Sequence, residues 1–167
     1  MALVKKRQCA GAALLVLWAA LSGLWCSAAF AQTPLENGQK GLRAIALFEC
    51  TWLTTTSHQR FFDAGYKLGK EFLEADSKKQ VEFSDEMWGS AQFGTLSGWT
   101  ILSGYPYLEH TTADFKLGIL FEMAGSEARK AQKAINPYTV GQAEFDAVRA
   151  QVFAAKNCAV VDPGSGG

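Results

Sequence analysis

The sequence predicts an all-α protein, a bundle of about five helices in which a disulfide joins the first and last helices. Three observations support this prediction. Apolar residues recur at helical spacing along most of residues 42–158. No segment shows a clear alternation of apolar and polar residues, which a half-exposed strand requires. Cys50 and Cys158 lie near the two ends of the region. An α+β fold with short strands around residues 98–108 is the alternative.

The first 31 residues have the three parts of a secretory signal peptide. Residues 5–7 are basic, residues 10–24 are apolar, and residues 29–31 read Ala-Phe-Ala, the A-x-A pattern of a cleavage site. The apolar run is shorter than the roughly 20 residues that span a bilayer. We therefore expect removal of residues 1–31 and a periplasmic or secreted location. An uncleaved N-terminal anchor is the alternative.

The signal peptide also changes the charge of what remains. The full chain has 16 basic and 16 acidic residues, and all three charged residues of the signal are basic, so 13 bases face 16 acids after cleavage. A nucleic-acid-binding protein needs a basic face to neutralise phosphates, and this balance argues against one. It also argues against strong attraction to anionic lipid. The mature chain has the length of one ordinary domain.

The cysteines divide between the signal and the mature chain. Cys9 and Cys26 leave with the signal, and Cys50 and Cys158 remain. Two thiols in an oxidising compartment, with no third to compete, are expected to pair. In the chain-entropy model so long a loop stabilises the fold by roughly 4–5 kcal/mol. No C-x-x-C motif is present, so we expect a structural disulfide and not a redox centre.

Two helices are expected in the first half of the mature chain. Residues 32–41 contain a proline, an asparagine and two glycines, and are expected to form a flexible arm. From Leu42 to Trp52 the apolar residues have helical spacing, with Cys50 close beside the stripe, and threonines at 54–56 interrupt it. A second helix with a wide apolar face is expected over about 57–75.

The stretch that follows is unusual. Ser84 and the two acids after it resemble a helix start. Residues 87–108 then carry no charge and contain four glycines, which lower helix propensity. Their Ser, Thr and Gln residues disfavour a membrane span. We expect a buried helix of the bundle, with short strands and a membrane contact as the alternatives.

Two further helices complete the expected domain of residues 42–158. Thr111 or Thr112 is expected to cap a helix over about 113–123, which restarts through about 134. Asn136-Pro137 breaks the chain, and a last helix runs to about 156. Residues 159–167 are expected to be a disordered tail.

The sequence offers few candidates for chemistry. It contains no catalytic motif, no phosphate loop and no metal-ligand spacing. We therefore expect no catalytic residues, no metal and no cofactor. His58 and His110 stand alone, and both are candidates for pH sensitivity. Asp63 and Glu122 lie near apolar helix faces, where a cleft could make either a general acid. The candidate binding surface is aromatic: Trp88, Trp99, Tyr105 and Tyr107.

A set of spaced residues resembles small helical periplasmic proteins. Cys50 precedes a helix with the sequence Ala64-Gly65-Tyr66-Lys67-Leu68-Gly69, and a final helix at 145–155 leads to Cys158. A cysteine, a G-Y-x-x-G helix and a late helix carrying the partner cysteine are similar to HdeA/HdeB-type acid-stress chaperones and Tai-type immunity proteins. Neither family is enzymatic, and the resemblance implies that the chain binds another protein.

These observations predict an exported, non-enzymatic protein-binding module, either a stress chaperone or an immunity-like protein. In the chaperone version, acid protonates carboxylates and the two histidines, loosens the fold and exposes apolar surface. Two alternatives stay open. One is a small secreted enzyme with a carboxylate and histidine pocket. The other is a protein that associates with membranes through residues 87–108.

Overall fold

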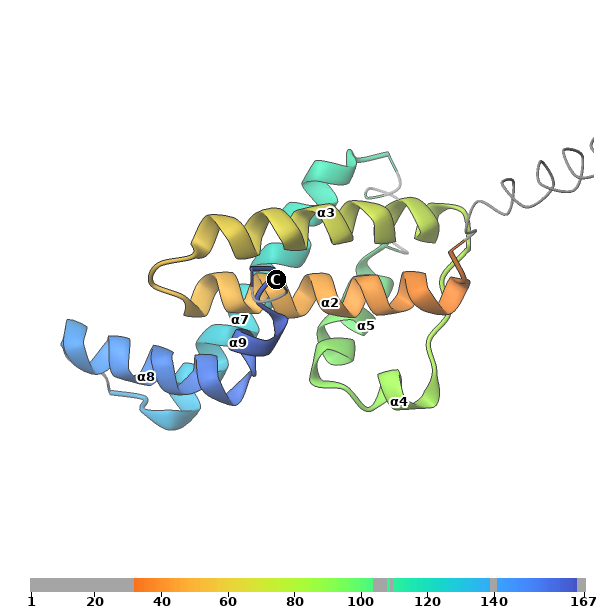
Figure 1. Cartoon of the computed structure of the whole chain (residues 1–167). Coiled ribbons are helices and arrows are strands. Elements are labelled where there is room, and N and C mark those ends of the chain that lie inside the picture. The colour runs from red at the N-terminus through yellow and green to blue at the C-terminus, as the bar shows by residue number, and fades with distance from the viewer. Residues whose placement is uncertain (1–31, 104–107, 109, 139–140, 165–167) are drawn as a thin grey trace, which may run out of the picture. The chain divides into compact units, whose positions relative to one another are not determined.

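The computed structural model describes residues 32–103, 108, 110–138 and 141–164, without the side chains of 99–103. Over these residues every regular element is a helix, which confirms the all-α prediction. Figure 1 shows their arrangement. In chain order the helices are α2 (Pro34–Leu53), α3 (His58–Ser77), α4 (Asp85–Trp88), α5 (Ala91–Ser103), α7 (Ala113–Ile135), α8 (Gln142–Ala155) and α9 (Cys158–Val161).

Helix α2 is the centre of the fold. It contacts α3, α5, α7, α8 and α9, and it lies antiparallel beside α3 (Figure 1). Ile45 and Phe48 on this helix are fully buried, together with Leu47 on a neighbouring position. Burying a side chain of this size contributes about 1.5–3 kcal/mol. Two apolar clusters meet along α2, one shared with α3, α5 and α7 and the other with α3, α7, α8 and α9.

The start of α2 differs from the expected flexible arm, since residues 34–41 are helical. Thr33 caps the helix: its hydroxyl accepts from the Glu36 amide, and the Glu36 carboxylate accepts from the Thr33 amide at 2.8 Å. Pro34 takes the first helical position, where it loses no hydrogen bond and its φ suits the helix. These residues therefore begin a helix, although their composition resembles a loop.

Close packing explains why asparagine and glycine occur in this first part of α2. Asn37 is buried, and its side-chain amide donates to the Gln80 carbonyl at 2.9 Å. A Cβ on Gly38 would lie 2.1 Å from the carbonyl oxygen of Glu82. The polar and small residues here allow the segment after α3 to lie directly against α2.

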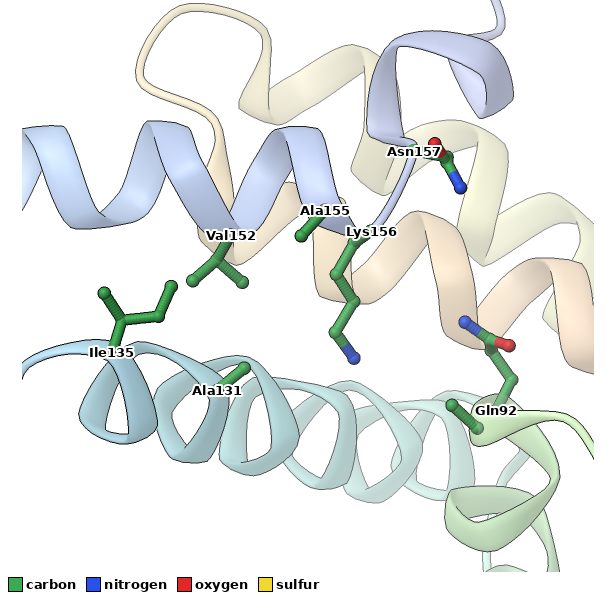
Figure 2. Close-up of a pocket in the computed structure, with 8 residues that line it drawn as sticks. Gln92, Ala131, Ile135, Val152, Ala155, Lys156 and Asn157 are labelled. Carbon is green, nitrogen blue, oxygen red and sulfur yellow. The ribbon is translucent and has the colours of Figure 1, made fainter.

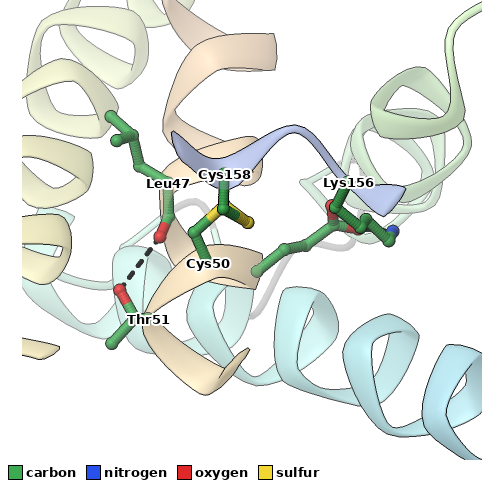
Figure 3. Close-up of a disulfide and its surroundings, with 6 residues drawn as sticks. Leu47, Cys50, Thr51, Lys156 and Cys158 are labelled. Atoms are coloured by element: carbon green, nitrogen blue, oxygen red, sulfur yellow. Dashed lines mark hydrogen bonds and ion pairs between the residues drawn. A yellow bond between two sulfur atoms is a disulfide. The ribbon is translucent and has the colours of Figure 1, made fainter. Parts of the chain in front are cut away.

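The disulfide joins the first and last described helices, as predicted. Cys50 on α2 and Cys158 on α9 have Cα atoms 5.6 Å apart and both are buried (Figure 3). The same figure shows Thr51 beside the bridge, donating to the Leu47 carbonyl at 2.9 Å. The bridge spans 108 residues of sequence and fixes the end of the domain to its centre.

A second link ties α8 to the end of α2. The Arg149 guanidinium donates to the Thr54 carbonyl at 2.6 Å and to the Trp52 carbonyl at 3.3 Å. These carbonyls belong to the last turn of α2 and the residue after it, where a cation also complements the helix dipole. Arg149 and the disulfide thus hold the two ends of the α8–α9 segment against α2.

The middle of the chain is helical despite its glycines. Helix α5 covers Ala91–Ser103, so the alternative prediction of short strands is wrong for residues 98–103. Residues 104–107 of that alternative lie outside the described residues. A Cβ on Gly98 would lie 3.0 Å from the Met123 Cε atom, so this glycine lets α5 approach α7 closely. Among the helices described here, none is both long and apolar enough to cross a membrane.

Three other boundaries bear on the predictions. Helix α3 matches the expected second helix within about two residues. Helix α7 begins after Thr112, whose hydroxyl accepts from the Phe115 amide, but it continues to Ile135 without the expected restart. Helix α9 extends to Val161, so the first residues of the expected disordered tail are helical; residues 165–167 lie outside the described residues.

Candidate functional site

The most unusual feature of the interior is a buried ion pair. Glu49 lies in α2 with 1% of its surface exposed, and its Oε1 atom is 2.8 Å from the Lys156 Nζ atom. Glu49 immediately precedes Cys50, and Lys156 is two residues before Cys158. The disulfide therefore lies beside the ion pair and holds its two segments together.

Burial raises the pKa of the Glu49 carboxyl above its ordinary value of 4.5. Hydrogen bonds from Lys156 and Gln92 and the Lys156 charge oppose this rise, and the charge of Glu127 adds to it. The folded state thus binds a proton at Glu49 more tightly than the unfolded chain does. Stability from this group therefore increases as the pH falls through the raised pKa toward 4.5.

Two open hollows meet at this ion pair. The first, about 360 Å³, lies between α7, α8 and the start of α5. Figure 2 shows Ile135 of α7 and Val152 of α8 on opposite sides of it, with Lys156 pointing between the two helices. The second, about 640 Å³, lies over α2 and α9 and has Leu42, Val160 and Val161 on its walls.

The two hollows are neighbours, and we treat them together as the groove. Gln92, Lys156 and Asn157 line both of them. The lining residues come from α7, α8 and the start of α5 on one side and from α2 and α9 on the other. Most of the remaining lining residues are aliphatic, except Gln39 and Arg43 on α2, and the three shared residues are polar.

Two cations line the groove, Lys156 and Arg43, and none of the described residues that line it is acidic. The Lys156 charge is paired with Glu49, so Arg43 supplies the uncompensated positive charge. Arg43 is exposed and makes no ion pair or hydrogen bond with any residue in the described parts of the chain. Lys156 has three donor hydrogens, and the bond to Glu49 uses one. The arrangement can hold a carboxylate beside apolar groups.

The structure places only part of the expected aromatic surface. Trp88 is 59% exposed, and its ring lies 4.2 Å from that of Phe93 and 6.3 Å from that of Phe83. Trp99 lies on α5, but its side chain is outside the description, and Tyr105 and Tyr107 are outside the described residues. A shared aromatic surface therefore stays a prediction.

The two histidines lie away from the groove lining. His58 begins α3, and its Nδ1 atom is 3.0 Å from the Thr51 carbonyl oxygen. His110 is exposed in the turn before α7. Their pH sensitivity stays a prediction.

The residues expected for an enzymatic pocket do not come together. Asp63 is exposed and accepts a hydrogen bond from Gln59 at 2.7 Å. Glu122 is exposed, 3.6 Å from Arg129. Neither contacts the other or His58, so no candidate acid–base pair forms from the three. Across the described positions, no group of three His, Cys, Asp or Glu side chains is placed to hold a metal ion.

Sequence reasoning did not identify the ion pair of Glu49 and Lys156 or the groove residue Arg43. Glu49 had a usable signal, because it lies beside the apolar stripe of its helix and next to a cysteine expected to be bridged. Lys156 lies two residues from the partner cysteine, so pairing the cysteines would also have brought these two charges near each other. Arg43 had no signal, because an exposed arginine on a helix is ordinary.

Comparisons with family models, with curated proteins and with solved structures found no match. The resemblance to the two periplasmic families therefore stays a prediction. The groove, the ion pair and the disulfide are the features from which function can be argued.

Proposed function

We propose that this chain is an exported protein-binding module that acts by contact with another protein and not by catalysis. The observation that carries the proposal is the groove, an open, aliphatic and positively charged surface at the junction of five helices. The signal-peptide pattern in residues 1–31, which lie outside the described residues, supports export.

The surroundings of the groove support a binding role because they are held firmly. The disulfide fixes α9 to α2, and the Glu49–Lys156 pair fixes the end of α8 to the same helix. A preorganised surface loses less conformational entropy on binding than a flexible one, which favours affinity. A covalent bond and an ion pair therefore constrain the segments that form the groove walls.

Of the two versions of this role, the ion pair favours a binder that works at neutral pH over an acid-loosened chaperone. Acid neutralises Glu49, and because its pKa is raised this protonation favours the folded state. Asp114 and Glu74 have lowered pKa values, mainly through hydrogen bonds from Tyr66 and Lys78, and their effect is opposite. Both are exposed, so solvent screens their contribution.

Photo-cross-linking in the exporting cells tests the proposal. A photoreactive amino acid replaces Gln39 in the groove, Trp88 in the exposed aromatic cluster, or Lys67 on the exposed side of α3 as control. We expect one defined adduct from a binding position and none from Lys67. The partner, once identified and purified, must then bind the mature chain in solution. Equal labelling at all three positions, or no binding by the purified partner, contradicts the proposal.

The acid-chaperone version has its own test. Binding of an apolar dye and protection of a model client from aggregation are measured from neutral to acidic pH. We expect no increase in either as the pH falls toward 4.5, the ordinary pKa of Glu49. A sharp rise in both would contradict the preference for a neutral-pH binder.

A further inference from the structure

We propose that the groove binds a polypeptide segment of the partner in which carboxylate side chains stand beside aliphatic ones. The inference rests on the proposed function and specifies the ligand of the same surface. It depends on three properties of the groove: the sign of its charges, the character of its walls and its openness.

The charges select an acidic ligand. Gln39, Arg43 and Ala46 line the second hollow and are spaced four and three residues apart, so they share one face of α2. Arg43 thus projects from a rigid helix with no partner of its own among the described residues. A guanidinium binds a carboxylate through two parallel hydrogen bonds, which gives geometric specificity as well as attraction.

The centre of the groove adds further donors. Lys156 keeps donor hydrogens beyond the one given to Glu49, and the Gln92 and Asn157 amides lie beside it. With Glu49 buried behind Lys156, the surface presented to a ligand has donors and no carboxylate. A second acidic side chain of the same segment can therefore be accommodated there.

The walls select aliphatic neighbours for those acids. Val160 is 78% exposed on α9, and Ile135 is exposed at the end of α7. Leu42 on α2 is half-buried and adds apolar surface to the second hollow. Exposed branched side chains gain by being covered, so a wholly hydrophilic acidic segment would leave this surface unused.

The openness of the groove selects a polypeptide over a compact small molecule. Sites for small ligands enclose most of the ligand surface, whereas both hollows here are open to solvent. Two open, neighbouring hollows suit a chain segment that is part of a larger interface. The excess of acids in the mature chain opposes a polyanionic nucleic acid.

Nuclear magnetic resonance titration of the mature protein tests the inference. The probe is an acetylated, amidated hexapeptide of alternating leucine and glutamate, with the leucine–glutamine peptide and octanoate as comparison ligands. We expect the glutamate peptide to shift the amides of Arg43, Asn157 and Val160, residues that line the second hollow. The glutamine peptide and octanoate are expected to produce little change.

Two charge-matched variants locate the site. Arg43→Glu is expected to weaken peptide binding by about tenfold, because it replaces the recognising cation with a repelling charge. Lys67→Glu makes the same change in net charge on an exposed position of α3 outside the groove, and binding is expected to stay within about twofold. Unchanged spectra of the free variants away from the substitution show that both fold.

Several results would overturn the inference. Equal weakening by the two variants shows only a long-range charge effect. Equal binding of the glutamine peptide would show that the ligand does not have to be acidic. Shifts produced by octanoate and not by the glutamate peptide would show that the ligand is not a polypeptide. No shifts with the glutamate peptide exclude the groove as its site. If the partner instead cross-links through Trp88 and binds Arg43→Glu normally, the protein-binding function stands and only the groove assignment fails.

Discussion

At the scale of single residues, the buried ion pair of Glu49 and Lys156 is the feature of the interior to which stability should be most sensitive. A carboxylate this deeply buried is destabilising unless a cation and further hydrogen bonds compensate for its lost hydration. Lys156 and Gln92 supply that compensation only in part, since burial still raises the pKa of Glu49. The stability of the fold should therefore respond sharply to changes in this pair.

Lys156→Ala is expected to lower the free energy of unfolding by about 3 kcal/mol at neutral pH, because it leaves the Glu49 charge buried and unpaired. Urea denaturation measures the change. Lys78→Ala is the control: Lys78 also pairs with a glutamate, Glu74, but on an exposed helix surface where such pairs contribute little. Equal losses in the two variants would mean that burial of the Glu49 pair has no special effect.

Glu49→Gln is expected to remove one source of pH dependence. Because the pKa of Glu49 is raised in the folded state, the natural protein should gain stability relative to this variant as the pH falls from 7 toward 4.5. Paired denaturation curves at several pH values measure the difference. A relative loss of stability by the natural protein over this window would show that the pKa is lowered instead.

At the scale of elements, helices with a cap signal and a strong apolar face were predictable. The bounds of α3 and the Thr112 cap of α7 agree with the sequence pattern. The start of α2 was not predicted, because proline, asparagine and glycine are read first as loop residues. The capping-box spacing of Thr33 and Glu36 was the available signal. Composition alone does not predict that the segment after α3 packs closely against the start of α2. That packing requires Gly38 and Asn37.

Two glycines within helices should respond in opposite ways to alanine. Gly38→Ala places a methyl group against the Glu82 carbonyl and is expected to destabilise the fold by about 2 kcal/mol or more. Gly94→Ala on α5 meets no atom within 4 Å and is expected to stabilise it by up to about 1 kcal/mol. Thermal and urea unfolding of both variants measure these changes. A reversed order would contradict the packing of α2 against the segment after α3.

At the scale of the whole molecule, the disulfide fixes α9 against α2 beside the groove. It was predictable from the two cysteines outside the expected signal peptide, and it joins α2 to α9 as expected. The groove was not predictable, because its residues come from α2, α5, α7, α8 and α9 and carry no shared sequence pattern. The groove lies beside the bridge, so a bond that forms in oxidising compartments stabilises the proposed binding surface.

The double variant Cys50→Ser, Cys158→Ser is expected to lose about 4 kcal/mol of stability, because the unfolded chain regains the freedom of a long closed loop. Denaturation of this variant and of the natural protein under non-reducing conditions gives the difference. The natural mature chain should contain no titratable thiol. Two free thiols, or equal stability of the two proteins, would contradict a structural disulfide.

The central claim is that the groove beside the Glu49–Lys156 pair is where this protein binds its partner. The most direct measurement uses the purified partner that cross-linking has identified. Calorimetry gives its affinity for the natural mature protein, for Arg43→Glu and for Lys67→Glu. The account predicts that Arg43→Glu weakens binding by about tenfold and that Lys67→Glu leaves it nearly unchanged. Equal affinities for all three proteins would contradict it.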